Sequence, residues 1–132
     1  MEFIISLHAK ALHIVYTLAA LAIIFPLVDV VRRRALSKAS VWSVRAYMIG
    51  ATLQFLLGIT QLLARWSDFG DGLRYRVEHA GLMFVAIICI HMAPRFMRRN
   101  DVIGTRNTVI LMVASLALVF LGVTLIRTVL RG

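Results

Sequence analysis

The segment Arg76-Val-Glu-His-Ala-Gly-Leu-Met-Phe-Val-Ala-Ile-Ile-Cys-Ile-His-Met-Ala-Pro94 is an apolar run that carries one carboxylate and two histidines. As a helix rising ~1.5 Å per residue, a run of this length crosses the ~30 Å hydrocarbon core of a bilayer. Ionisable side chains at membrane depth are costly unless they are paired or ligated. Glu78, His79 and His91 are therefore candidate functional residues, and the rest of the chain is expected to surround this helix.

The composition indicates that lipid is the solvent. Hydrophobic residues make up 61% of the 132 residues, and the mean hydropathy is +0.86, whereas soluble domains are nearer half apolar. Four apolar runs, roughly 4–30, 43–64, 76–94 and 107–128, are separated by short polar connectors. Lipid cannot satisfy backbone groups, so continuous apolar runs of this kind predict helices. The expected fold is all-α, an integral membrane up-down-up-down four-helix bundle forming a single domain over 1–132.

The basic residues predict the orientation of this bundle. Nine cations fall on the side of the first and third connectors, against two carboxylates, whereas the other side has six cations and four carboxylates. By the positive-inside rule both termini lie away from the cytoplasm, an N-out/C-out arrangement. Because the charge of +9 gathers at helix ends and forms no stripe with interleaved aromatics, no nucleic-acid partner is expected. The nine cations are Arg32, Arg33, Arg34, Lys38, Arg45, Arg95, Arg98, Arg99 and Arg106.

The second helix carries a seam of small and amide side chains. Gly50, Gln54, Gly58 and Gln61 recur on one helical face. Such a seam usually serves close helix packing in membranes, and the alternative is that it makes room for a flat cofactor or a quinone, with Gln54 or Gln61 as hydrogen-bond donor. Both interpretations stay open. Ser40, just before Val-Trp, is the expected N-cap of this helix.

Three histidines are predicted to meet at one level of the membrane. In an up-down-up-down bundle the first and third helices run parallel, so His8, His13 and His79 all lie in its outer part. At ~1.5 Å per residue, His79 lies about 10 Å outward of the midplane, His8 about 15 Å and His13 about 7 Å. Two imidazoles on facing helices are what a six-coordinate b-type haem needs. The depths leave open whether His8 or His13 is the partner of His79.

The neighbours of His79 fit the same hypothesis. The charged residues that could bind the haem propionates or orient the histidine ligand are Glu78, Arg76 and Arg74. Met83 lies one helical turn from His79 and would line the pocket. A copper site of His8, His13, His79 and Met83 is a weaker alternative, since both first-helix histidines would have to turn inward. His91 lies some 18 Å further in and has no histidine partner at its level.

The chain has none of the short motifs of nucleotide binding, nucleophilic catalysis or zinc hydrolysis. The single Cys89 lies within the third run, where a lone cysteine usually acts as a small hydrophobe.

Three short motifs resemble those of a group of small bacterial four-span membrane proteins that are labelled cytochrome b-like. The motifs are Leu7-His8, Gln54-Phe-Leu-Leu-Gly58 and Glu78-His79-Ala-Gly-Leu-Met83. The resemblance implies a b-type cytochrome in a bacterial cytoplasmic (inner) membrane and favours His8 over His13 as the partner of His79. The chain departs from the group at Ala80, where a proline is usual, and near Thr52, where the group has a histidine.

The hypothesis from the sequence is a protein with haem b held by His8 and His79 near the outer face. It would pass electrons between a quinol pool, or a respiratory or photosynthetic partner subunit, and an acceptor on the outer side. The alternative is a cofactor-free accessory subunit, which predicts that the gap between the histidines is packed shut. A small channel or transporter, which requires a polar path from His79 to His91, ranks third. The sequence leaves open whether the chain is an enzyme and whether it forms an oligomer.

Overall fold

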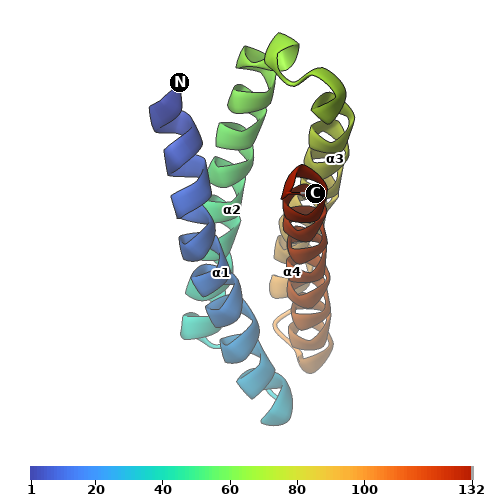
Figure 1. The fold of residues 1–132 in the computed structure, drawn as a ribbon. Coiled ribbons are helices and arrows are strands. Elements are labelled where there is room, and N and C mark those ends of the chain that lie inside the picture. The colour runs from blue at the N-terminus through green and yellow to red at the C-terminus, as the bar shows by residue number, and fades with distance from the viewer. Residues whose placement is uncertain (132) are drawn as a thin grey trace.

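Four long helices make up nearly all of residues 1–131, the part of the chain described by the computed structural model (Figure 1). Within this part no strand is present, so the all-α prediction is confirmed. Each long helix is long and apolar enough to cross a membrane. The helices are α1 (Glu2–Val31), α2 (Lys38–Ala64), α3 (Leu73–Met97) and α4 (Val102–Arg131), and the short 3-10 helices η1 (Trp66–Asp68) and η2 (Gly70–Gly72) connect α2 to α3.

α2 and α4 begin before their predicted apolar runs, and a polar residue caps each of them. The N-cap of α2 is Ser37, whose hydroxyl accepts a hydrogen bond from the Ser40 amide at 3.2 Å. The prediction that Ser40 caps this helix is therefore wrong, and α2 starts earlier than the predicted residue 43. Asp101 likewise precedes α4 and accepts from the Gly104 amide at 2.7 Å. Its ion pair with Arg99, together with this amide, lowers the pKa of the Asp101 carboxyl.

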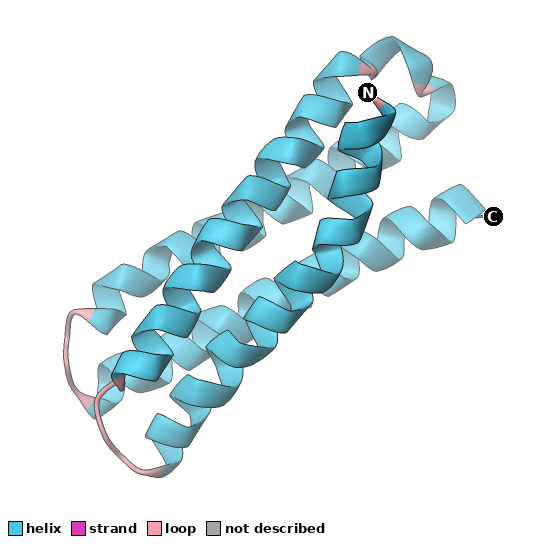
Figure 2. Cartoon of the chain, turned by 90° about the vertical axis from the view of Figure 1, so that its left-hand side faces the viewer, coloured by secondary structure: helices cyan, strands magenta, loops and turns pink. Residues whose placement is uncertain are grey.

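The bundle consists of two helical hairpins. α1 packs chiefly on α2, and α3 on α4, while the hairpins meet through α1 against α4 and α2 against α3. The first and third helices are therefore diagonal to each other. Figures 1 and 2 show the N-terminus near the α2–α3 connection, and the two other connectors together at the opposite end of the bundle. The chain thus runs up, down, up and down, as predicted.

The packed core occupies only one half of the bundle. Most of its buried side chains come from the second halves of α1 and α3 and the first halves of α2 and α4, which together form the half next to connectors 32–37 and 98–101. This packed half leaves the other half for a cavity. The core residues are Val15, Ala19, Ala22, Val44, Tyr47, Ala51, Ile90, Ala93 and Met112.

A buried carboxylate fixes the first connector. Asp29 is fully buried and accepts hydrogen bonds from the Ser37 amide, the Ser37 and Ser40 hydroxyls and the Arg34 guanidinium, the last at 2.6 Å. The Thr105 hydroxyl of α4 in turn donates to the Arg34 carbonyl at 2.9 Å. Connector 32–37 is therefore tied to both α1 and α4.

One polar pair links the two hairpins inside the core. The hydroxyls of Tyr47 on α2 and Ser115 on α4 are 2.9 Å apart, and both side chains are fully buried. We expect Tyr47→Phe to destabilise the bundle by about 1 kcal/mol, the usual worth of a hydrogen bond between membrane helices. Ser115 keeps its bond to the Met112 carbonyl at 2.8 Å, so no hydroxyl is orphaned. Unfolding in mixed SDS micelles measures the loss, and an unchanged midpoint would contradict it.

Large apolar side chains cover the outside of all four helices. Their exposure fits contact with the acyl chains of a bilayer, as the membrane prediction requires. Examples with 45% or more of the side chain exposed are Ile14, Ile24, Ile49, Leu53, Leu56, Leu63, Phe84, Ile110, Phe120 and Leu121.

Candidate functional site

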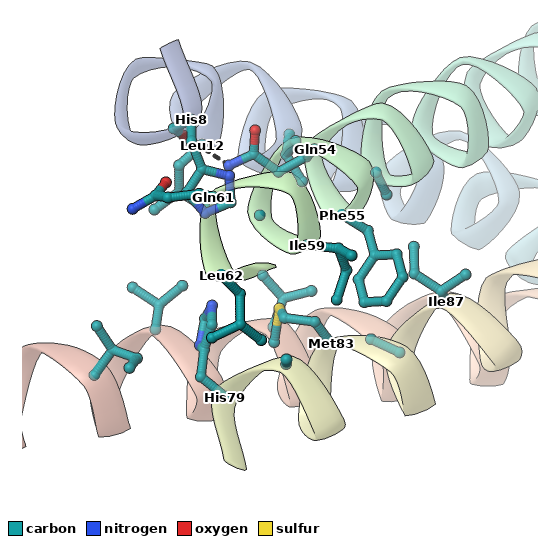
Figure 3. A pocket seen from close by; sticks show the side chains of 18 of the residues that line it. His8, Leu12, Gln54, Phe55, Ile59, Gln61, Leu62, His79, Met83 and Ile87 are labelled. Carbon is teal, nitrogen blue, oxygen red and sulfur yellow. Dashed lines mark hydrogen bonds between the residues drawn. The ribbon is translucent and has the colours of Figure 1, made fainter. Parts of the chain in front are cut away.

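A cavity of about 280 Å³ lies between the two hairpins in the half that the core leaves open. It is partly open to the outside, and all four helices contribute to its walls. Its volume is close to the lower end of the range of roughly 300–1,000 Å³ that is typical of ligand sites. The two diagonal helices bring His8 and His79 to its opposite walls (Figure 3).

His79 is held in one orientation by α4. Its Nδ1 lies 2.8 Å from the backbone carbonyl oxygen of Gly122. A carbonyl only accepts, so Nδ1 carries the proton in this pair. The neutral ring then keeps its lone pair on Nε2, the nitrogen that remains free to bind a metal.

The imidazole of His79 and the side chain of Met83 occupy the space that a side chain at Gly122 would need. A Cβ at this position would lie 3.2 Å from His79 Nδ1 and would collide with the Met83 methyl group. Gly122 is itself buried. The close approach of α3 and α4 here is therefore built around His79.

His8 packs against a second glycine. A Cβ on Gly58 would lie 2.9 Å from His8 Cε1, closer than real Cβ contacts. The Gln54 amide nitrogen donates to the His8 backbone carbonyl at 2.7 Å and so fastens the first turns of α1 to α2. Gly58 and Gln54 thus position His8 on the cavity wall.

The cavity gathers polar atoms that have no partner. Of the buried side-chain nitrogen and oxygen atoms in the described part of the chain, four lack a hydrogen bond, and all four belong to residues that line this cavity. Buried polar groups are nearly always paired, so such a cluster indicates a site shaped for a polar or metal-containing ligand. The atoms are His8 Nδ1, Gln54 Oε1, Gln61 Oε1 and Arg76 Nε.

Two arginines line the cavity, one from each helix of the second hairpin. Arg76 comes from α3 and Arg127 from α4. The Arg76 guanidinium lies over the Phe69 ring, 4.1 Å from its centroid, which holds it in place. The pair gives the cavity two positive charges that suit a ligand bearing carboxylates.

Glu78 lies outside the cavity, contrary to the expectation from the sequence. It is exposed and forms an ion pair with Arg74 at 3.0 Å. On a helix, the residue next to His79 points about 100° away from it, which explains the difference. Met83, Gln54, Gly58 and Arg76 do line the cavity with the two histidines.

The other two histidines lie apart from the cavity. His13 is exposed on α1, and the exposed His91 has its Nε2 3.0 Å from the Thr52 hydroxyl. A copper site that includes His13 is therefore not assembled, and among the described residues no three His, Cys, Asp or Glu side chains form a metal-binding group.

Two residues of the site, Gly122 behind His79 and Arg127 on the cavity wall, are not among the candidates from the sequence. Their position in the outer half of the fourth helix places them at the level of His79. The sequence does not show that they face His79 or the cavity, because that depends on how α4 packs against α3.

In comparisons with known proteins, no family model, curated protein or solved structure matches this chain.

Proposed function

We propose that this chain is a membrane protein that binds one haem b between His8 and His79 and takes part in electron transfer. The observation that carries the proposal is the cavity itself, because it brings two imidazoles from diagonal helices together with all four unpartnered polar atoms. A haem iron held by two histidines supplies one-electron redox chemistry.

His79 has the environment of a metal-binding histidine. Such residues almost always donate their second ring N–H to a carbonyl or carboxylate, which fixes the tautomer and the ring plane. The Gly122 carbonyl does this for His79. Nε2 is thereby prepared as a ligand before any group binds.

His8 completes the pair from the opposite wall. Its Nδ1 has no partner, and the oxygens of Gln54 and Gln61 in the same cavity have no donor. An N–H on the His8 ring can therefore be satisfied by a glutamine oxygen, as Gly122 satisfies that of His79. Arg76 and Arg127 supply charge for the two propionate groups.

The proposed place of the protein is a bacterial cytoplasmic membrane, with the cavity in the outer half of the bilayer. This follows from the positive-inside orientation, since nine cations and two carboxylates lie in or near connectors 32–37 and 98–101. A haem there would exchange electrons with quinol or a partner subunit and with an acceptor on the outer side.

The cofactor-free accessory role is less well supported. It requires the space between the histidines to be packed shut, whereas a cavity of about 280 Å³ lies there. The transporter role needs a polar path from His79 to His91, and His91 lines no part of this cavity.

Titration with ferric haem b tests the proposal. We expect saturation at one haem per chain with the low-spin spectrum of two imidazole ligands. Gly58→Ala places a methyl group 2.9 Å from His8 Cε1, so we expect it to weaken binding by about 1–3 kcal/mol, as overpacking does.

Gly81→Ala is the matched control, because a Cβ there meets nothing within 4 Å. It should leave the affinity unchanged. Binding that never saturates, or equal affinities for Gly58→Ala and the parent chain, would contradict the proposed site.

A further inference from the structure

A second hollow lies at the opposite end of the bundle, between the start of α2 and the end of α3. Its volume is about 330 Å³. α2 and α3 pack less closely than either hairpin does, which leaves this groove open. We call it the α2–α3 groove; its lining residues are Val41, Arg45, Met48, Pro94, Met97 and Arg98.

The groove has two cations and no carboxylate of its own. At this end of the bundle, the two acidic residues are already engaged, Asp29 by Arg34 and Asp101 by Arg99. Over residues 1–131 neither Arg45 nor Arg98 forms an ion pair. The groove therefore keeps two uncompensated positive charges.

The remaining walls of the groove are apolar. Val41 and Met48 on α2 face Pro94 and Met97 on α3. A site with two guanidinium groups at a helix end and an apolar wall leading into the membrane matches the two halves of a phospholipid. A soluble anion would use only the cationic half.

The level of the groove also fits a lipid headgroup. Trp42 is 66% exposed, and Arg45 lies 5.6 Å from the centroid of its ring. Exposed tryptophans favour the boundary between headgroups and acyl chains. Arg45 and the groove should therefore lie at phosphate depth.

We propose that the α2–α3 groove binds the phosphate of an anionic phospholipid between Arg45 and Arg98, with an acyl chain against its apolar wall. Basic pockets between membrane helices on the cytoplasmic side bind such headgroups in the same way. The proposal is independent of haem binding, because none of its residues lines the cavity of His8 and His79.

Fluorescence quenching by brominated lipids tests this proposal. Trp42 and Trp66 are the two tryptophans of the chain, so Trp66→Phe leaves only the one beside the groove. Two bilayers are compared, one with brominated phosphatidylglycerol and unlabelled phosphatidylcholine, the other with brominated phosphatidylcholine and unlabelled phosphatidylglycerol. Trp42 fluorescence should be quenched more in the first. We expect a preference for the anionic lipid of roughly fivefold for each arginine.

The double variant Arg45→Gln/Arg98→Gln should reduce the ratio of anionic to neutral lipid beside Trp42 to about one. Arg98→Gln alone should lower this ratio while leaving the contact between Arg45 and Trp42 in place. The matched control is Arg32→Gln/Arg106→Gln, which removes the same charge at the same end of the bundle but outside the groove. It should keep most of the preference.

Three results would overturn the proposal. The first is equal quenching by the two lipids in the parent chain, and the second is an equal loss in the groove and control variants, which would indicate general surface charge. The third is release of the anionic lipid by millimolar inorganic phosphate, which would make the ligand a soluble anion. Persistence of the preference in inorganic phosphate supports the lipid.

Discussion

Alanine in place of His79 is expected to weaken haem binding by at least about 100-fold and to abolish the low-spin spectrum. Loss of a partner that merely orients a metal ligand already costs roughly 10–100-fold, and His79 is proposed as a ligand itself. Its ring also donates to the Gly122 carbonyl, so alanine removes both the proposed ligand and the contact that orients it. Haem titration followed by absorbance measures the effect, and His8→Ala should give a similar loss.

His13→Ala and His91→Ala are the controls for this experiment. Both histidines are exposed and line no part of the cavity. They should bind haem with the parent affinity and spectrum. Full low-spin binding by His79→Ala, or a loss in His13→Ala equal to that in His8→Ala, would contradict the assignment of the ligands.

Asp29→Ala is expected to destabilise the bundle by about 3 kcal/mol, as breaking a buried, charged hydrogen-bond network does. The carboxylate is fully buried and serves four donors. Its removal leaves the Ser37 amide without its acceptor and leaves the Ser40 hydroxyl with only the Ser37 hydroxyl, 3.1 Å away. Arg34 is 45% exposed, so water can solvate it and limit the loss. The unfolding midpoint in mixed SDS micelles measures the change.

Asp68→Ala provides the comparison for Asp29→Ala. Its side chain is 61% exposed and lies 3.8 Å from the Arg65 guanidinium, a surface pair worth at most about 1 kcal/mol. Asp68→Ala should therefore move the midpoint much less. If Asp29→Ala shifts the unfolding midpoint no more than Asp68→Ala does, connector 32–37 does not depend on the buried carboxylate.

The helices and their order were predictable from the sequence because lipid leaves the backbone few choices. Each apolar run is long enough to cross the hydrocarbon core, and short connectors force neighbouring helices to be antiparallel. The ends were less predictable, since capping depends on local hydrogen bonds. Ser37 and Ser40 both fit the pattern of a cap, and only the position of Asp29 shows that Ser40 is used for the buried network.

The depth of the candidate site residues in the membrane was predictable from the sequence, but the direction in which each side chain points was not. Residue spacing placed His8, His13 and His79 at similar depth, but it could not say which of the first two turns inward. That depends on how α1 rotates against α2, where Gly58 makes room for His8 and leaves His13 exposed. The role of the Gly122 carbonyl was hidden for a similar reason, because a backbone acceptor has no signature in the sequence.

Haem binding is tested most directly by a reduced-minus-oxidised absorption spectrum of the protein purified from cells that are amply supplied with haem. We expect a reduced α band in the region of b-type cytochromes, with one haem per chain. A colourless protein would contradict haem binding and leave the cofactor-free accessory subunit as the better explanation of the fold.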